Sequence, residues 1–301
     1  MARRPLARRL ARQGAELALR LVAVFLTAGL CSFLTIYRPV LRAIYDALES
    51  YAAFVAGVGT AWQDVGPFVL ADYTSSMLAL GAALALALAI GLPAGLLAGT
   101  RRASPLAAII RLASSLGSMM PAFLLALAIM VFFVLYVLPL TGVRFILLSS
   151  QEPTTDPRRL LPIALTLAAR PLAYFTAVTE AATRDTLAAD YIRTARAKGL
   201  PELLVLARHV LPHVLVTLVG AVPAALLFSV STLPIVEFVF SWPGVGQELL
   251  YRIVASPEAS PRTAALVAFL LASIGGTYVL VALLAETARR LLDPRAHLAE
   301  R

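Results

Sequence analysis

Long apolar runs alternate with short polar segments along this 301-residue chain, and the alternation predicts a polytopic, all-α membrane protein. A helix needs ~20 apolar residues to cross a bilayer, and most of the runs have about that length. We expect six transmembrane helices, at about residues 21–36, 75–99, 121–138, 160–179, 214–235 and 264–285. Because the first run is short, we expect its helix to extend at both ends.

Composition supports a membrane protein over a soluble one. Apolar residues make up 60% of the chain and charged residues 14%, with a mean hydropathy of +0.83. Soluble domains average about 45–50% apolar and about 25% charged residues. The formal charge of +9 is spread between the apolar runs and forms no basic face. We therefore expect membrane lipid, and no nucleic acid, among the partners.

The distribution of basic residues predicts the orientation in the membrane. If both termini are cytosolic, the inner segments carry eighteen Lys and Arg residues and the outer segments seven. This bias favours an N-in, C-in topology. We divide the chain into a basic cytosolic N-terminus (1–20), a first span with an external segment (21–73), a transmembrane domain (74–290) with a cytosolic loop at 184–210, and a cytosolic tail (291–301).

One polar, Arg-rich segment stands between two apolar runs, from Asp190 to Pro212. The pattern predicts an amphipathic helix over residues 185–198 that ends at Gly199, because Pro201 prevents its continuation. Its apolar face would carry Leu187, Ala188, Tyr191, Ile192 and Ala195, and its polar face Asp185, Asp190, Arg193 and Arg196. Such a helix either lies on the lipid surface or fits a groove on a partner protein.

This segment resembles the EAA-type coupling motif of ABC importer permeases, in which Gly and a later Leu-Pro stand at fixed spacing. Gly199 supplies the Gly, and Leu211-Pro212 lies twelve residues further on. Arg193-Thr194-Ala195 occupies the position of the Glu-Ala-Ala triplet of the motif. This substitution resembles the sequences of the dipeptide/oligopeptide/nickel branch of the family. The literal triplet Glu180-Ala181-Ala182 lies too far upstream to be the motif.

Two further segments carry the same resemblance. Residues 237–246 (EFVFSWPGVG) are similar to the segment after the fifth span of that branch. Residues 90–95 (IGLPAG) and residues 118–123 together form a third, looser match to that branch. The whole resemblance covers residues 74–295. Two external features depart from the branch. No Pro-Gly-Asp-Pro type segment occurs between Leu34 and Asp72, and residues 256–261 (SPEASP) replace an Asp-Tyr-Pro-like segment.

The resemblance implies a type I ABC importer permease fold in a bacterial-type inner membrane. It implies a second homologous permease subunit, two cytosolic ATPase subunits and an external solute-binding protein as partners. ATP and Mg would bind to the ATPase subunits, and this chain would hold no cofactor. The ATPase-coupling residues that the resemblance implies are Asp190, Tyr191, Arg193, Thr194, Ala195, Arg196, Ala197, Lys198, Gly199, Leu211 and Pro212.

Within the importer class, di- and oligopeptides are the leading substrates, with nickel complexes or oligosaccharides as alternatives. The competing class is an intramembrane enzyme or a self-contained secondary transporter. An enzyme should show a nucleophile and a base, or ligand clusters, inside its spans, and a secondary transporter should show intramembrane acids and inverted repeats. None of these features is evident in the sequence. The chain also lacks Walker A, G-x-S-x-G and G-x-G-x-x-G motifs. We therefore expect no catalytic residues and ATP hydrolysis on separate subunits.

Two charged residues stand out as candidates for the substrate path. Arg170 lies within the fourth span, where a charge costs about 2.5–3.5 kcal/mol and usually faces a cavity or a partner. It either lines the path or pairs structurally. Glu237 ends the fifth span and either touches substrate or stabilises the helix end. His209 and His213 are four residues apart but have no third ligand nearby, and Cys31 is the only cysteine, so we expect no metal site and no internal disulfide.

Overall fold

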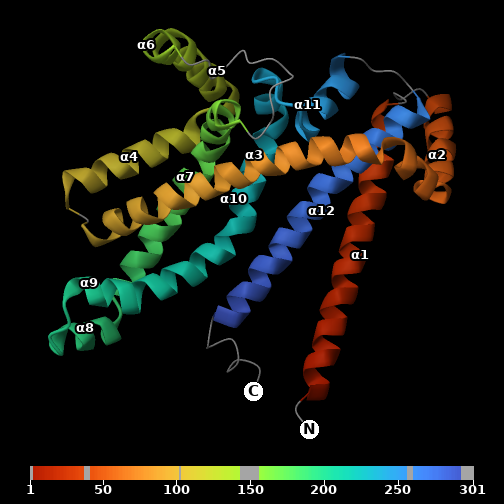
Figure 1. The fold of residues 1–301 in the computed structure, drawn as a ribbon. Helices are drawn as coiled ribbons and strands as arrows, with labels where there is room; N and C mark the ends of the chain where they lie inside the picture. The colour runs from red at the N-terminus through yellow and green to blue at the C-terminus, as the bar shows by residue number, and fades with distance from the viewer. Residues whose placement is uncertain (1–2, 37–40, 102, 143–155, 256–259, 293–301) are drawn as a thin grey trace. The chain divides into compact units, whose positions relative to one another are not determined.

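The computed structural model of the chain describes residues 3–36, 41–101, 103–142, 156–255 and 260–292, which form helices joined by short turns, without a strand. Figure 1 shows the arrangement. The α-helices are α1 (Arg3–Ile36), α2 (Leu41–Ala56), α3 (Val58–Thr100), α4 (Pro105–Met119), α5 (Ala122–Phe132), α6 (Leu138–Thr141), α7 (Pro157–Leu187), α8 (Asp190–Ala197), α9 (Glu202–Val205), α10 (Leu211–Val239), α11 (Val245–Leu250) and α12 (Pro261–Leu292). Three π-helical turns, Phe133–Val137, Leu206–Val210 and Tyr251–Ala255, join or extend them.

Six helical segments among the described residues are long and apolar enough to cross a membrane, which confirms the predicted number of spans. They are Gly14–Leu34, Val58–Thr100, Ala122–Thr141, Pro157–Leu187, Glu202–Val239 and Pro261–Leu292. Each contains the expected apolar run or nearly all of it. Helix α1 extends beyond its run at the N-terminal end, upstream of Leu21, and ends at Ile36, the last residue of the run.

The segment 37–73 was predicted to be external, and its described part is helical. Residues 37–40 lie outside the described part, and α2 follows. From Val58 onward the chain is already part of α3, whose 43 residues make a helix about 65 Å long. Gly57 forms the only turn between α2 and α3, so the polar residues after it lie on the same helix as the second apolar run. Their external position stays a prediction.

Helix α4 lies between the second and third predicted spans, where no helix was predicted. Ser104 caps this helix by accepting a hydrogen bond from the Ala107 amide at 3.2 Å, and Pro105 occupies the first helical turn. Both residue types are typical of helix starts. Met120 and Pro121 are extended, so α4 and α5 are separate helices.

The described residues fall into two compact units. The first contains residues 1–77 and 241–283, and the second contains residues 78–240 and 284–301. Helices α3 and α12 each contribute to both.

Aromatic side chains form the core of the first unit. The Phe269 ring lies 5.0 Å from Trp62 and 5.5 Å from Phe54, measured between ring centroids. The buried hydroxyl of Ser32 donates to the Ala264 carbonyl at 2.7 Å, which ties α1 to α12. Gly275 allows the same two helices to approach closely, because a Cβ there would lie 2.5 Å from Val24 Cγ1.

The segment after α10 begins with a buried tryptophan in the same unit. Trp242 is 0% exposed and its indole N–H donates to the Ser75 carbonyl at 3.2 Å. The Val245 amide, at the start of α11, donates to Ser76 Oγ at 2.8 Å. These two bonds attach the WPGV sequence to α3, which gives it a structural role.

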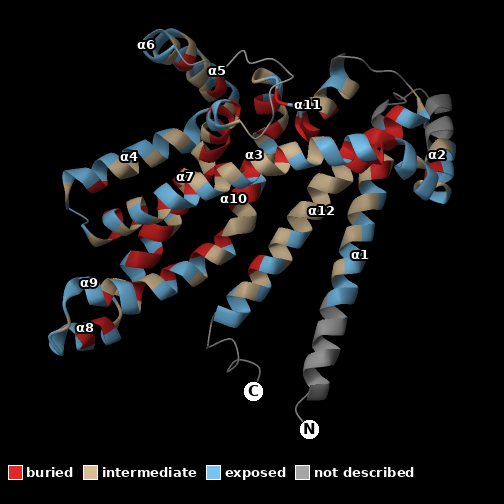
Figure 2. Cartoon of the chain, in the orientation of Figure 1, coloured by how far each residue is buried: buried red, intermediate tan, exposed pale blue. Residues whose placement is uncertain are grey.

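Helix α7 is the centre of the second unit. Figure 2 shows many buried residues along it, and 56% of its most apolar part is buried, against 11% for the span that begins at Ala122. It packs against α10, where the buried Ser229 hydroxyl donates to the Leu167 carbonyl at 3.2 Å. It also packs against α3, because a Cβ on Gly95 would lie 2.6 Å from the Thr176 carbonyl oxygen. Close helix approach through small residues is typical of membrane proteins.

Helix α7 starts at a well-formed cap. Asp156 accepts a hydrogen bond from the Arg158 amide at 2.8 Å, and Pro157 follows at the first helical position. Hydrogen bonds from the side chain and the amide of Arg158 hold the pKa of Asp156 below its usual value. The helix also contains Pro162 and Pro171, whose missing N–H groups are tolerated in buried transmembrane helices.

Candidate functional site

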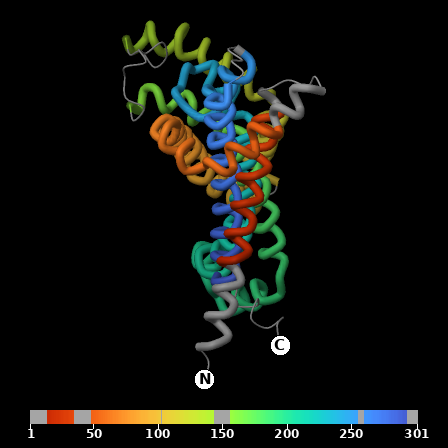
Figure 3. The backbone as a smooth tube through the Cα atoms, turned by 90° about the vertical axis from the view of Figure 1, so that its right-hand side faces the viewer, coloured from red at the N-terminus to blue at the C-terminus, as the bar shows by residue number. Residues whose placement is uncertain are grey.

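The Arg-rich segment forms a short helix and a turn at one end of α7 and α10. In Figures 1 and 3, α8 and α9 lie together where α7 ends and α10 begins. Ile192 (0% exposed) and Ala195 (6%) form the buried face of α8, and Tyr191 is 45% exposed. On the polar face, the Arg193 guanidinium lies 3.7 Å from the Asp190 carboxylate, with both side chains largely exposed. The helix therefore presents a charged outer face on an apolar base.

The boundary of this helix differs from the predicted one. A single helix over residues 185–198 was expected, but α7 continues to Leu187 and a new helix begins at Asp190. Ala189 is extended between the two. Leu187 and Ala188 thus do not share a face with Ile192, and the apolar face predicted for the motif was too long.

Gly199 ends α8 as the sequence predicted. Its φ of +77° lies in the left-handed region, which only glycine adopts without strain. The Gly199 amide donates to the Arg196 carbonyl at 2.9 Å, and the Leu200 amide donates to the Ala195 carbonyl at 3.4 Å. These two bonds define a Schellman motif, in which the residue after the helix reverses the chain direction.

A bidentate ion pair spans this turn. Arg196 Nε lies 3.1 Å from Glu202 Oε2, and Arg196 Nη2 lies 2.6 Å from Glu202 Oε1. The hydrogen bonds that Arg196 donates to the Glu202 carboxylate raise the pKa of Arg196 above its usual value. Two parallel hydrogen bonds fix the relative orientation of the two side chains as well as the distance between them. The pair therefore holds α8 against the start of α9.

The chain enters α10 through buried apolar residues. Val205 and Val210 are both 0% exposed, and Leu211-Pro212 forms the first turn of α10. A proline is favourable there because its missing N–H would have no helical partner. The His209 ring lies edge-on to the Tyr191 ring, with centroids 6.5 Å apart, so this histidine contacts α8. Among the described residues, no group of three His, Cys, Asp or Glu side chains is placed to hold a metal ion.

The structure brings the predicted coupling residues together. Asp190, Tyr191, Arg193, Thr194, Ala195, Arg196 and Ala197 lie on α8, Lys198 and Gly199 form its end, and Leu211 and Pro212 begin α10. The literal triplet at Glu180 lies on α7 instead. The sequence motif therefore describes one compact helix–turn–helix element that joins two spans.

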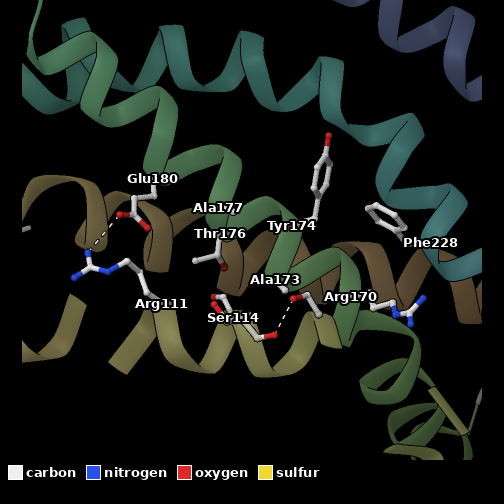
Figure 4. Close-up of a pocket in the computed structure, with 11 residues that line it drawn as sticks. Arg111, Ser114, Arg170, Ala173, Tyr174, Thr176, Ala177, Glu180 and Phe228 are labelled. Carbon is white, nitrogen blue, oxygen red and sulfur yellow. Dashed lines mark hydrogen bonds and ion pairs between the residues drawn. The ribbon is translucent and has the colours of Figure 1, made fainter. Parts of the chain in front are cut away.

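A cavity of about 550 Å³ lies between α4, α7 and α10. Figure 4 shows its lining residues. Tyr174 and Phe228 form an aromatic part of the wall, with ring centroids 5.4 Å apart. The other lining residues are Arg111, Ser114, Ser115, Ser118, Arg170, Ala173, Thr176, Ala177 and Glu180. Its size is within the range of about 300–1,000 Å³ that is usual for ligand pockets.

Arg170 lines this cavity, so the two candidate path residues can be compared. The Nε atom of Arg170 is buried and has no hydrogen-bond partner among the described residues. Glu237, by contrast, is 0% exposed near the end of α10 and is not among the residues that line the cavity. The structure does not bring Glu237 and Arg170 to one site.

Sequence reasoning missed a charged cluster at one end of the cavity. Glu180 is 8% exposed, and its Oε1 lies 3.4 Å from Arg111 Nη1 and 3.8 Å from Arg184 Nη1. Figure 4 shows Glu180 and Arg170 at opposite ends of the cavity. The pair of Glu180 and Arg184, four residues apart, is visible in the sequence. The contact of Arg111 with Glu180 is not, because it depends on how α4 packs against α7.

The family model and the individual proteins that match this chain all describe membrane components of transport systems. A family model described as "Binding-protein-dependent transport system inner membrane component" matches residues 91–298. The chain is 41% identical over 95 residues, 31% of its length, to a dipeptide transport system permease protein of Haemophilus influenzae. It is 32% identical over 117 residues, 39% of its length, to an oligopeptide transport system permease protein of Streptococcus pneumoniae. A glutathione transport system permease protein of Pectobacterium atrosepticum is 40% identical over 87 residues, 29% of the chain. These matches span only 28%, 22% and 28% of the respective relatives' own lengths.

Proposed function

Because this chain belongs to the family of binding-protein-dependent transport system inner membrane components, we propose that it is one of two transmembrane permease subunits of an ATP-driven ABC importer. The second permease would be homologous to it. Two cytosolic ATPase subunits and an extracytoplasmic solute-binding protein would complete the complex. ATP and Mg²⁺ would bind to the ATPase subunits, while this chain contributes the path through the membrane.

The observation that carries this proposal is the helix–turn–helix element at residues 190–212. It joins the two most closely packed spans of the second unit, α7 and α10, so a force on α8 reaches both. Its turn is fixed by Gly199 and by the Arg196–Glu202 pair. A rigid element at the end of two packed helices is suited to transmit the movement of a partner.

In the cycle we propose, ATP binding closes the ATPase dimer and moves α8. The movement of α7 and α10 opens the path toward the outer side, where the binding protein delivers its solute. ATP hydrolysis then returns the helices to the inward-open arrangement. The domain division and the N-in, C-in orientation belong to this proposal, because α8 must be cytosolic to meet an ATPase.

Di- and oligopeptides are the solutes we favour. The relatives that match this chain are named as dipeptide, oligopeptide and glutathione permeases. Nickel complexes and oligosaccharides are the alternatives within the same importer class. A self-contained secondary transporter is the less favoured class, since it would have no use for a docking element at the end of α7.

Co-purification tests the proposal. The tagged chain is extracted in mild detergent, and the proteins that accompany it are identified by mass spectrometry. We expect two ATPase subunits and a second permease, with a solute-binding protein joining when it is added. A stable chain that purifies alone and transports solute in liposomes without ATP would contradict the importer and support the secondary transporter.

A further inference from the structure

The cavity between α4, α7 and α10 carries an uncompensated positive charge. Glu180 is the only carboxylate among its lining residues, and it already contacts two guanidinium groups, those of Arg111 and Arg184. Arg170 lies ten positions before Glu180 on α7, about 15 Å away along the helix. None of the described carboxylates lies within ion-pair distance of Arg170, and its buried Nε lacks a hydrogen-bond partner.

A buried polar group without a partner is costly, so the end of the cavity near Arg170 favours a ligand that supplies an acceptor. Guanidinium groups bind carboxylates and phosphates through two parallel hydrogen bonds. Ser114 and Tyr174 add hydroxyl groups to the lining, and Phe228 adds apolar surface beside Tyr174. The ligand chemistry that fits is an anionic group attached to a partly apolar body.

We infer that this cavity binds an anionic group, and that Arg170 selects the free carboxylate of the transported solute. The inference rests on the proposed importer function and narrows its substrate class. It favours peptides with a free carboxyl terminus over neutral oligosaccharides, which gain nothing from the charge. It disfavours metal complexes of net positive charge, which the guanidinium repels. The phosphate of an anionic lipid has the same chemistry and must be distinguished experimentally.

A thiol reporter in the cavity measures its charge directly. Ser118 lines the cavity on α4, next to Gly117, where a Cβ would lie 3.8 Å from the Ala169 carbonyl near Arg170. In the full chain within its purified complex, Cys31→Ser removes the only native cysteine and Ser118→Cys supplies the reporter. Its rates of reaction with an anionic and a cationic methanethiosulfonate are compared. Their ratio cancels differences in thiolate reactivity and exposure.

We expect the ratio of the anionic rate to the cationic rate to be higher for the reporter cysteine than for a cysteine in an exposed peptide. Arg170→Gln should lower this ratio about tenfold, since one unit charge at close range changes both rates in opposite directions. Arg170→Lys should retain most of it. The control Arg101→Gln removes an exposed positive charge outside the cavity lining and should leave the ratio unchanged. If Arg170→Gln does not accumulate, Glu180→Gln provides the test with the opposite sign, a raised ratio.

Protection experiments identify the source of the anion. Trialanine at millimolar concentration should slow labelling at least threefold more than trialanine amide, which lacks the carboxylate. The same comparison is made in phosphatidylcholine and phosphatidylglycerol nanodiscs. If the ratio of the anionic to the cationic labelling rate falls only in phosphatidylglycerol, and trialanine gives no protection, the cavity binds a lipid headgroup. That result would overturn the assignment of the cavity to the carboxylate of the solute. Equal protection by the two peptides, or by neither, would overturn it as well.

The labelling requires neither ATP nor transport, so the two proposals fail separately. A complex without uptake activity but with an Arg170-dependent charge ratio contradicts the importer function alone. A complex that transports peptides but shows the same ratio with Arg170→Gln as without it contradicts the inference about the cavity.

Discussion

The Arg196 guanidinium and the Glu202 carboxylate form two hydrogen bonds, of 3.1 Å and 2.6 Å, across the turn that Gly199 makes. They connect the last turn of α8 to the first residue of α9. An exposed ion pair of this kind contributes less than about 1 kcal/mol to stability. Its importance is geometric, because it limits how far α8 can tilt relative to the span that follows.

We predict that reversing one member of this pair, in Arg196→Glu, lowers the number of solutes transported per ATP hydrolysed without lowering expression. The double variant Arg196→Glu with Glu202→Arg should restore much of the coupling. Uptake and ATP hydrolysis measured on the same proteoliposomes provide the ratio. No recovery in the double variant would show that Arg196 acts through a contact other than Glu202.

Replacing Gly199 should uncouple the transporter. An L-residue in the left-handed region costs roughly 1–2 kcal/mol, and Gly199→Asp also places a negative charge beside Lys198. We expect the variant to insert in the membrane and its complex to hydrolyse ATP, with uptake at least tenfold lower. Gly142, with a φ of +68° at the end of α6, is the matched control for backbone strain. Normal transport by Gly199→Asp would remove the coupling role of this turn.

A third prediction concerns the contact between α3 and α7. Gly95→Ala should lower the thermal stability of the protein, because its Cβ would lie 2.6 Å from the Thr176 carbonyl oxygen. Overpacking of this kind costs about 1–3 kcal/mol. Gly81→Ala on the same helix meets no atom within 4 Å, and the change to a better helix former should leave stability equal or higher. Thermal unfolding in detergent checks both, and equal midpoints would contradict the close packing.

The role of Arg170 can be separated from assembly by kinetics. We predict that Arg170→Ala raises the KM for uptake of a carboxylate-bearing peptide about tenfold or more, as expected for loss of a charge-assisted hydrogen bond of about 1.5–3 kcal/mol. The yield of assembled complex and the maximal uptake rate should change little. An unchanged KM with a reduced yield would assign Arg170 a structural role.

The orientation of the chain is tested by labelling from the two sides. In a Cys31→Ser background, a cysteine at Arg193 on α8 should react with an impermeant reagent only from the cytosolic side. A cysteine at Arg158, at the start of α7, should react only from the outer side. Both side chains are exposed in the structure, so access within the chain does not limit labelling. The opposite pattern would exclude the N-in, C-in topology.

The sequence allowed prediction of the spans and of the turn at Gly199, because apolar run length and a glycine followed by Pro201 are local signals. Local signals misplaced the boundary between α7 and α8. No glycine or proline marks it, although Ala189 is extended there. Helix α4 was not predicted either, although its cap at Ser104-Pro105 is visible in the sequence.

The cavity could be predicted only in part. Arg170 was recognisable as a charge within an apolar span, but the cluster of Arg111, Glu180 and Arg184 joins residues on two helices. Glu237 has the same sequence signal as Arg170, a charge at a span, yet its side chain is fully buried away from the cavity lining. The difference depends on side-chain direction in the packed unit, which a single sequence does not determine.

The central claim is that α8 docks on an ATPase subunit. The most direct test places the photo-crosslinking residue benzoylphenylalanine at Tyr191, which is 45% exposed on α8, and at Leu140, which is 84% exposed on α6. After illumination of native membranes, we predict an adduct between the Tyr191 variant and the ATPase subunit, and none from the Leu140 variant. Adducts with lipid alone at Tyr191 would show that α8 lies on the membrane surface, and would contradict its role in coupling.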